Sequence, residues 1–194
     1  MRRESVHCRM AQLLLTPHPS FSSEAVAQIE VQVTSQPADG LALSYIMSGQ
    51  TGDIHMPSVV AAERSDKLWR HTCFEMFVGT SESTAYYEFN FAPSTRWAAY
   101  RFNDYRSGMA VATEIDAPWI EVQAAPDCYT LKASVQIDRL SALSRKSVWR
   151  LGLSAVVEDK AGRMSYWALA HPPGKPDFHC KDCFAYEFSP AVSA

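Results

Sequence analysis

Along most of the chain, apolar and polar residues alternate with a period of two, which is typical of β-strands with one buried face. The segment YTLKASVQI, residues 129–137, shows this clearly, because every second side chain in it is apolar. The alternation, together with enrichment in Val, Ile, Tyr, Phe and Trp, predicts a series of strands. These cover residues 26–34, 41–48, 72–79, 85–92, 96–103, 119–124, 128–137, 148–158 and 164–169.

Clusters of Gly, Pro, Asp and Ser separate the predicted strands at the spacing that is typical of β-sandwiches. Only residues 59–64 and 138–143 show a helical pattern, and each is a turn or two long. The expected fold is therefore all-β: a single antiparallel β-sandwich, curved and jelly-roll or immunoglobulin-like, with short helical turns. Residues 49–67 and 171–178 are the least regular, and long loops in compact domains often carry function.

The composition fits one folded domain. The chain has 194 residues, of which 47% are hydrophobic and 20% charged, well inside the range of globular proteins. Residues 10–194 are expected to form the domain, after a flexible tail of residues 1–9. The formal net charge of −3 and the lack of a dense Lys/Arg run argue against nucleic acid as a partner.

The first residues contain only a short apolar run, residues 13–15, which is too short for the hydrophobic region of a signal peptide. No stretch approaches the roughly 18 consecutive apolar residues that would cross a bilayer, so a membrane is not an expected partner. These features predict a cytoplasmic protein. Its five cysteines, an odd number, are expected to be reduced thiols.

Aromatic and charged residues are densest in residues 68–109. Alternation places Glu75 on one face of its strand with Cys73 and Phe77, and places Glu88 and Asn90 together on the next strand. A sheet face rich in Glu, Asn, Arg, Trp and Tyr is costly as a core unless its polar groups are paired. Such a face is well suited to binding a ligand.

Carbohydrate is the ligand class that this mixture favours. Sugar hydroxyls bind to carboxylate, amide and guanidinium groups, whereas the C–H faces of the ring lie on aromatic rings. The side chains that offer both are Trp69, Trp97, Tyr100, Glu75, Asn90 and Arg101. An alternative stays open, in which Glu75 and Arg101 form an ion pair across the sheet and Trp97 and Tyr100 are ordinary core residues.

Three separated motifs, LWRHTCFEMF, YYEFNFAPSTRWAAYRFNDYRSGM and YWALAHPPGKPDFH, occur in that order. In these motifs the chain resembles the bacterial DOMON-like proteins, which are related to family 9 carbohydrate-binding modules. The resemblance spans residues 13–188 and implies a curved β-sandwich with a ligand site on a concave face, in a family whose members bind sugars or haem. By motif position, the characteristic residues are Trp69, Arg70, His71, Glu75, Asn90, Trp97, Arg101, Tyr105, Arg106, His171, Asp177 and His179.

The function predicted from these observations is non-catalytic binding of a carbohydrate or sugar-derived ligand on the concave face. Trp69 and Trp97 are the expected stacking platforms, and Glu75, Asn90 and Arg101 the expected partners of hydroxyl groups. The segment HPPGKPDFH, residues 171–179, is expected either to be a rigid cover of a sheet edge or to lower His171, Asp177 and His179 over the site. In the second case binding weakens as these histidines change charge between about pH 5 and 8.

Three other functions remain as alternatives. Haem needs two axial ligands facing each other across an apolar slot; the candidate ligands are Met47, Met56, Met76, Met109, His55, His71, His171 and His179. A zinc half-site is suggested by His179, Cys180 and Cys183, with His171 upstream, although no second pair of ligands is evident. A sugar hydrolase would use Glu75 and Glu88 as paired carboxylates, and a Cys–His pair of Cys73 and His71 is a further arrangement. No catalytic residue and no cofactor is assigned.

Overall fold

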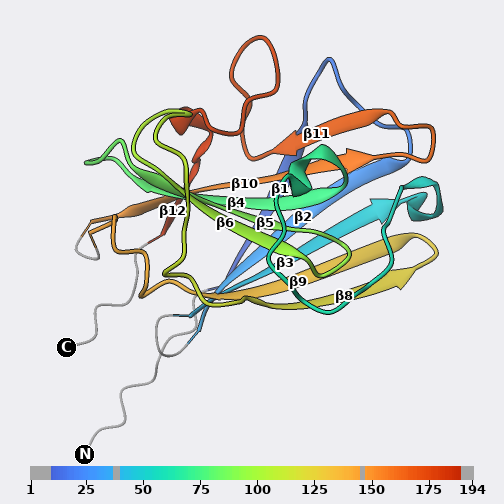
Figure 1. The fold of residues 1–194 in the computed structure, drawn as a ribbon. Helices are drawn as coiled ribbons and strands as arrows, with labels where there is room; N and C mark the ends of the chain where they lie inside the picture. The colour runs from blue at the N-terminus through green and yellow to red at the C-terminus, as the bar shows by residue number, and fades with distance from the viewer. Residues whose placement is uncertain (1–9, 37–39, 145–146, 189–194) are drawn as a thin grey trace, which may run out of the picture.

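The computed structural model describes residues 10–36, 40–144 and 147–188, and its twelve strands form one continuous sheet (Figure 1). The strands are β1 (Met10–Pro17), β2 (Val26–Gln36), β3 (Gly40–Gly49), β4 (Cys73–Thr80), β5 (Tyr86–Phe91), β6 (Trp97–Phe102), β7 (Ala110–Val111), β8 (Trp119–Ala125), β9 (Cys128–Gln136), β10 (Trp149–Glu158), β11 (Met164–Ala168) and β12 (Tyr186–Phe188). Three single 3-10 turns complete the structure: η1 (Thr51–Asp53), η2 (Leu68–Arg70) and η3 (Lys181–Cys183). The predicted tail, residues 1–9, lies outside the described residues.

The sheet folds over itself into two layers because β1 belongs to both. The strand order is β7-β6-β5-β4-β10-β11-β1-β2-β3-β9-β8, with β12 paired to β10, and the pairings are antiparallel. Residues 10–15 of β1 pair with β2, whereas Thr16 and Pro17 pair with β11. One layer therefore contains β4, β5, β6 and β10, and the other contains β2, β3, β8 and β9 (Figure 1). This arrangement confirms the predicted antiparallel β-sandwich.

The hydrophobic core lies between the two layers. Alternate residues of β2 and β3, such as Ile29 and Tyr45, face alternate residues of β4 and β5, such as Met76 and Phe89, and all four are fully buried. The Tyr45 hydroxyl donates a hydrogen bond of 2.7 Å to the backbone carbonyl of Glu75, which links the layers. Each fully buried apolar side chain contributes about 1.5–3 kcal/mol, so this core supplies most of the driving force for folding.

The predicted strands are confirmed, with ends that lie within two residues of the observed bounds. The two predicted helices are wrong. Residues 59–64 are held extended beside β6, because Arg64 forms a bridge with Trp97 and the Ser65 amide donates to the Trp97 carbonyl. Residues 138–143 form separate turns rather than a helix. Strands β1, β7 and β12 are not among the predicted strands, and β7 and β12 are too short for alternation to predict.

The outer face of β4 and β10 is covered by the C-terminal segment. Phe184 packs directly on the backbone at Gly152, where a Cβ atom would lie only 2.8 Å from the ring. The ring belongs to a second apolar cluster on this face, which also contains Phe77, Tyr86, Ala98, Tyr100 and Phe102. The segment therefore seals one part of the outer face, and the part beside it remains open as a pocket.

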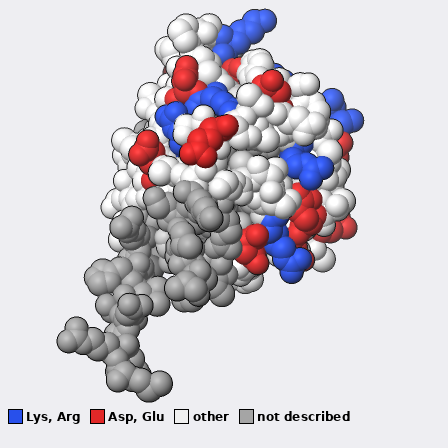
Figure 2. Space-filling view, turned by 90° about the vertical axis from the view of Figure 1, so that its left-hand side faces the viewer, with Lys and Arg blue, Asp and Glu red and all other residues white. Residues whose placement is uncertain are grey.

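Basic and acidic side chains are interspersed on the face of the molecule shown in Figure 2. The described residues contain no helical segment with the length and hydrophobicity that crossing a bilayer requires. Cys73, Cys128, Cys180 and Cys183 are free thiols. On the face shown in Figure 2, charges of both signs therefore lie side by side.

Candidate ligand pocket

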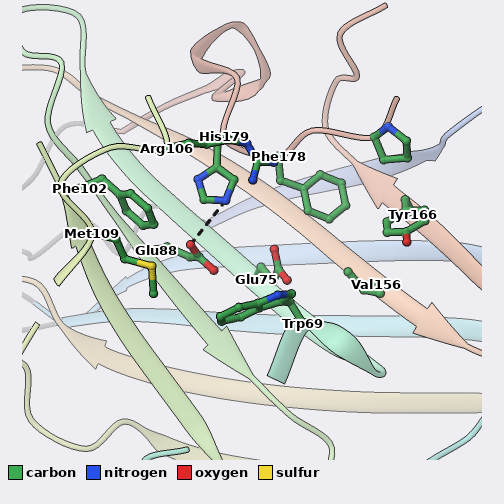
Figure 3. Close-up of a pocket in the computed structure, with 11 residues that line it drawn as sticks. Trp69, Glu75, Glu88, Phe102, Arg106, Met109, Val156, Tyr166, Phe178 and His179 are labelled. Atoms are coloured by element: carbon green, nitrogen blue, oxygen red, sulfur yellow. Dashed lines mark ion pairs between the residues drawn. The ribbon is translucent and has the colours of Figure 1, made fainter. Parts of the chain in front are cut away.

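A cavity of about 350 Å³ opens on the outer face of β4, β5, β10 and β11 (Figure 3). Its floor is formed by these strands, and its walls and roof come from η2, the β6–β7 loop and residues 176–179. The lining side chains are Trp69, Glu75, Glu88, Phe102, Arg106, Met109, Val156, Tyr166, Pro176, Phe178 and His179. Ligand pockets are typically about 300–1,000 Å³, so this cavity suits a small molecule.

Two buried carboxyl groups form the polar part of the floor. Glu75 pairs across the strands with Asn90, and Glu88 pairs with Phe77, so the two glutamates are diagonal neighbours on one face. Oε1 of Glu88 accepts a hydrogen bond of 2.7 Å from the Asn90 amide. Oε1 of Glu75 is buried and has no hydrogen-bond partner among the described residues. The pocket therefore contains a polar atom that the protein itself leaves unsatisfied.

Burial controls the ionisation of both carboxyl groups. Loss of hydration raises the pKa of Glu75 well above its ordinary value, and the nearby Glu88 carboxylate raises it further, against the opposing effects of the neighbouring Ser154 hydroxyl and of Arg106. Burial also raises the pKa of Glu88, to about 7, against the opposing effects of the Asn90 hydrogen bond and of Arg106. With a pKa of about 7, Glu88 is protonated in roughly half of the molecules at neutral pH, so the floor can donate hydrogen bonds as well as accept them.

Above the floor, Asp177 ties the roof together. It accepts hydrogen bonds from the Arg106 guanidinium at 2.7 Å and from the Tyr105 hydroxyl at 2.5 Å, and its Oδ1 accepts from the His179 amide at 3.1 Å. Partial burial opposes ionisation of this carboxyl, but the Tyr105 and Arg106 contacts outweigh it and lower the pKa of Asp177. The result is an anchored ion pair that joins the β6–β7 loop to residues 176–179.

His179 forms the part of the roof that faces Glu88. Its Nδ1 lies 2.8 Å from the Tyr86 hydroxyl, and its Nε2 lies 3.8 Å from Oε2 of Glu88 (Figure 3). The ring packs edge-on against Phe77 and Phe102, with centroids 5.1 Å apart in each case. Burial, assisted by the positive charge of Arg106, lowers the pKa of His179 to about 4, so the imidazole is neutral at physiological pH.

Trp69 provides the aromatic wall opposite this roof. Lys67 adopts a left-handed backbone conformation, with φ of 61°, which turns the chain into η2 and brings Trp69 over the floor. The indole packs edge-on against Tyr100 at a centroid distance of 5.8 Å. Tyr100 is itself fixed by a 2.6 Å hydrogen bond from its hydroxyl to Asp66. Tyr100 therefore positions a pocket residue without lining the pocket.

The structure brings together eight of the thirteen residues that the sequence predicted for the site. Four of them line the pocket: Trp69, Glu75, Arg106 and His179. Four more support those residues from behind: Asn90, Tyr100, Tyr105 and Asp177. All eight residues lie either on the outer face of β4, β5 and β6 or in the segments that cover this face.

The other five predicted residues lie outside the pocket, and two of them, Trp97 and Arg101, are on β6. Trp97 and Arg101 point to the opposite side of the strand from Tyr100, since alternate residues face opposite ways. Trp97 is 4% exposed, within the core, and the Arg64 guanidinium lies 4.1 Å above its ring. Arg101 pairs with Glu114 at 3.5 Å rather than with Glu75. Neither residue belongs to the pocket.

The other three lie outside the cavity lining. His171 Nε2 contacts the Thr16 carbonyl at 2.8 Å, and its ring packs against His18 beside a different cavity. Arg70 is exposed at the end of η2. His71 faces Glu158, whereas the Cys73 thiol faces Asn90, so the two do not form a nucleophilic pair. Loop 171–178 thus contributes Pro176, Asp177 and Phe178 to the site, but not His171.

Several lining residues were not among the predicted site residues. Glu88 lies two positions from Asn90 on β5, so the same alternation that placed Asn90 on the outer face could have predicted Glu88 as well. Val156 and Tyr166 are cross-strand partners on β10 and β11, far along the chain from the aromatic block, and nothing local marks them. Phe102 and Phe178 complete the apolar wall.

The haem that the resemblance implies does not fit this pocket. Met109 and His179 both line it, but the His179 ring nitrogens face the Tyr86 hydroxyl and Glu88, so neither is directed at an open axial position. The same contacts direct His179 away from a shared site with Cys180 and Cys183, of which Cys183 is buried.

Comparisons with known proteins show the fold. No protein-family model matches the chain, and no curated protein matches it. A solved structure of a candidate carbohydrate-binding protein from Bacteroides uniformis is similar, with a TM-score of 0.61 and 13% identity, over 91% of this chain and 84% of the other. Family 9 carbohydrate-binding modules from Caldicellulosiruptor kristjanssonii also match: the complex with cellotriose has a TM-score of 0.49 at 11% identity, over 85% and 75% of the two chains, and the complex with glucose 0.44 at 11%, over 79% and 71%.

Proposed function

We propose that this pocket binds a carbohydrate of one or two sugar rings. A ring placed on the floor meets carboxyl groups from Glu75 and Glu88, and its apolar C–H face meets the indole of Trp69. This division between polar and aromatic partners is the one that sugars require, because their hydroxyl groups lie around the rim of an apolar ring. The volume of about 350 Å³ limits the ligand to a small one.

The observation that carries the proposal is the unsatisfied Oε1 of Glu75. The side chain is 3% exposed, and the atom has no hydrogen-bond partner among the described residues. Leaving a buried polar atom unmatched costs about 1–3 kcal/mol, and the Glu75 side chain lines the cavity. A small rotation of the carboxyl group toward the cavity would let a ligand hydroxyl donate to it and recover that cost on binding.

The similar protein from Bacteroides uniformis supports this proposal, since it shares the fold and is described as a candidate carbohydrate-binding protein. Fold alone does not establish function, because one sandwich can host unrelated sites. The chemistry of the pocket is therefore the main support, and the similar fold is consistent with it.

Binding without hydrolysis fits the position of the two glutamates. Glycoside hydrolysis generally uses two carboxyl groups that flank the scissile bond. Glu75 and Glu88 instead are diagonal neighbours on one sheet face, so both reach a ligand from the same side. Across the cavity, the roof offers the Arg106–Asp177 ion pair and a neutral His179. This geometry favours a receptor or module that holds a sugar.

Isothermal titration calorimetry with glucose, galactose, N-acetylglucosamine and cellobiose tests the proposal. We expect at least one of these sugars to bind, and Trp69→Ala to weaken its binding about tenfold or more, since a stacking aromatic ring is a typical binding hot spot. Trp119→Ala is the matched control, because Trp119 is 57% exposed on β8 in the other layer. The proposal is wrong if no sugar binds or if both variants bind as the wild type does.

A further inference from the structure

A second group of chemically reactive side chains lies outside the pocket, where β10 ends. Nδ1 of His55 lies 3.2 Å from Oε2 of Glu158, and Nδ1 of His71 lies 2.6 Å from the same oxygen. One donor atom from each residue falls within 4.8 Å of the others, the one such grouping of three found among the described residues. None of the three residues lines the sugar pocket.

The backbone around this cluster is fixed by a buried threonine. The Thr72 hydroxyl donates to the His55 carbonyl at 3.0 Å and accepts from the Glu158 amide at 3.1 Å. The His55 amide in turn donates to the Glu158 carbonyl at 2.8 Å. Thr72 is 2% exposed. Three segments that are far apart in the sequence are therefore held together before any ligand arrives.

We propose that His55, His71 and Glu158 form a binding site for a divalent transition-metal ion, with zinc as the favoured metal. Two imidazole nitrogens and one carboxylate oxygen suit zinc and its neighbours, whereas magnesium and calcium prefer oxygen ligands. Three protein ligands leave a fourth position for water or another small ligand. The histidine side chains are 53% and 63% exposed, so an ion can enter from solvent.

The distances fit such an ion with little rearrangement. Zinc bonds of about 2.0–2.2 Å in tetrahedral geometry place neighbouring ligand atoms about 3.4 Å apart. The His55–Glu158 distance of 3.2 Å is close to this value, and the 2.6 Å between His71 and Glu158 must open by less than an ångström. The exposed His71 ring can rotate to open this distance, while the Thr72 hydrogen bonds hold the adjoining backbone in place.

A metal site explains why both histidines face Glu158 better than hydrogen bonding alone does. Exposed ion pairs and hydrogen bonds contribute little to stability, yet two imidazoles direct the same nitrogen, Nδ1, at a single carboxylate oxygen. A metal would fasten the irregular link that follows η1 to the end of β10. It would also fix His71, which directly follows η2. The proposal stands independently of sugar binding.

Calorimetric titration of the full chain, free of affinity tags and kept reduced, with Zn²⁺ tests this site. We expect one strongly bound ion per chain and a higher melting temperature in its presence, because the ion binds the folded state. Glu158→Gln keeps the shape of the side chain but removes the anionic ligand. It and His71→Asn are each expected to weaken Zn²⁺ binding at least about tenfold, as even loss of an outer-shell group has that effect.

Two control variants separate this site from other potential ligands. His171→Asn removes another partly exposed histidine, and Cys180→Ser removes a thiol from the Cys180–Cys183 pair; both are expected to bind Zn²⁺ like the wild type. Substituting Co²⁺ adds an optical test, since a thiolate ligand produces a charge-transfer band that nitrogen and oxygen ligands lack. The proposal is overturned if the wild type does not bind Zn²⁺, if Glu158→Gln binds it unchanged, or if Cys180→Ser abolishes binding.

Discussion

The two faces of β4 and β5 are equally buried but chemically different. On the face toward the core, Phe74, Met76 and Phe89 pack against the other layer in a nearly continuous apolar contact. On the outer face of the same strands, Glu75 and Glu88 are also 5% exposed or less. Glu75 thus lies on the polar floor of the pocket, whereas its sequence neighbours Phe74 and Met76 lie in the apolar core.

The difference shows which face serves stability. Burying a carboxyl group costs free energy unless it is fully matched, and Glu75 is not. An apolar residue in place of Glu75 would pack against the same neighbours without that cost, and the proposed binding role accounts for a carboxyl group at this position. The core face is expected to respond to truncation with a loss of stability, and the pocket face to neutralisation with a gain.

Truncation on the core side is expected to have the largest effect. Trp97→Ala removes a ring that is 4% exposed and stacked under Arg64, so we expect a loss of about 3–5 kcal/mol of unfolding free energy. Urea denaturation followed by circular dichroism measures this. The folded fraction is expected to keep its sugar affinity. Wild-type stability combined with lost binding would instead show that Trp97 contacts the ligand.

Trp97 also shows how far sequence alternation reaches. Alternation correctly divided β6 into one face with Trp97 and Arg101 and another with Ala98 and Tyr100. It did not say which face belongs with Glu75, because that depends on the pairing register, in which Glu88 lies opposite Tyr100. The prediction therefore took residues from both faces, Trp97 and Arg101 from one and Tyr100 from the other, and the register places only the face of Tyr100 beside the floor.

Other parts of the pocket depend on contacts that no local pattern encodes. Val156 and Tyr166 join the pocket because β10 pairs with β4 and β11 pairs with β10, a topology that the alternation of single strands cannot reveal. The resemblance did identify Asp177 and His179, but it grouped His171 with them. The rigid run Pro172–Pro173 follows His171, whose ring contacts the Thr16 carbonyl instead.

On the pocket face, neutralising Glu75 is expected to stabilise the protein. Burial raises the folded pKa of this carboxyl well above its ordinary value, so ionisation at alkaline pH costs the folded state more than the unfolded chain. Glu75→Gln removes the ionisable group, so we expect a gain of about 1–3 kcal/mol at pH 8 together with weaker sugar binding. Urea denaturation and calorimetry check both. A Glu75→Gln variant that is less stable than the wild type would contradict the idea that burying the Glu75 carboxyl group costs free energy.

Glu88 is expected to make stability depend on pH. Its pKa is about 7 in the fold, against an ordinary value of 4.5, so its contribution is complete below pH 4.5 and is lost as the pH rises toward 7. His179 acts oppositely, because its pKa is lowered to about 4: its contribution is present above pH 6.5 and is lost as the pH falls.

The comparison of Glu88→Gln with the wild type isolates the first effect. Between pH 5 and pH 7, we expect the variant to gain about 2 kcal/mol relative to the wild type, measured by urea denaturation at each pH. The exposed Glu187→Gln on β12 is the control, and its difference from the wild type is expected to stay constant. A constant difference for Glu88→Gln as well would mean that Glu88 titrates normally in the fold.

The smallest effect is expected at the rim of the pocket, where Tyr105 touches the roof but not the floor. Tyr105→Phe removes the hydrogen bond of the hydroxyl to Asp177 and leaves the Arg106–Asp177 contact in place. Because Tyr105 is 54% exposed, we expect the melting temperature to stay unchanged. Without this hydrogen bond, the side chains of Asp177 and Arg106 are held less firmly over the pocket. We therefore expect sugar affinity to fall by less than about tenfold, which corresponds to the loss of one hydrogen bond. A loss of affinity as large as that of Trp69→Ala would show that Tyr105 binds the sugar directly, which would extend the pocket beyond its present rim.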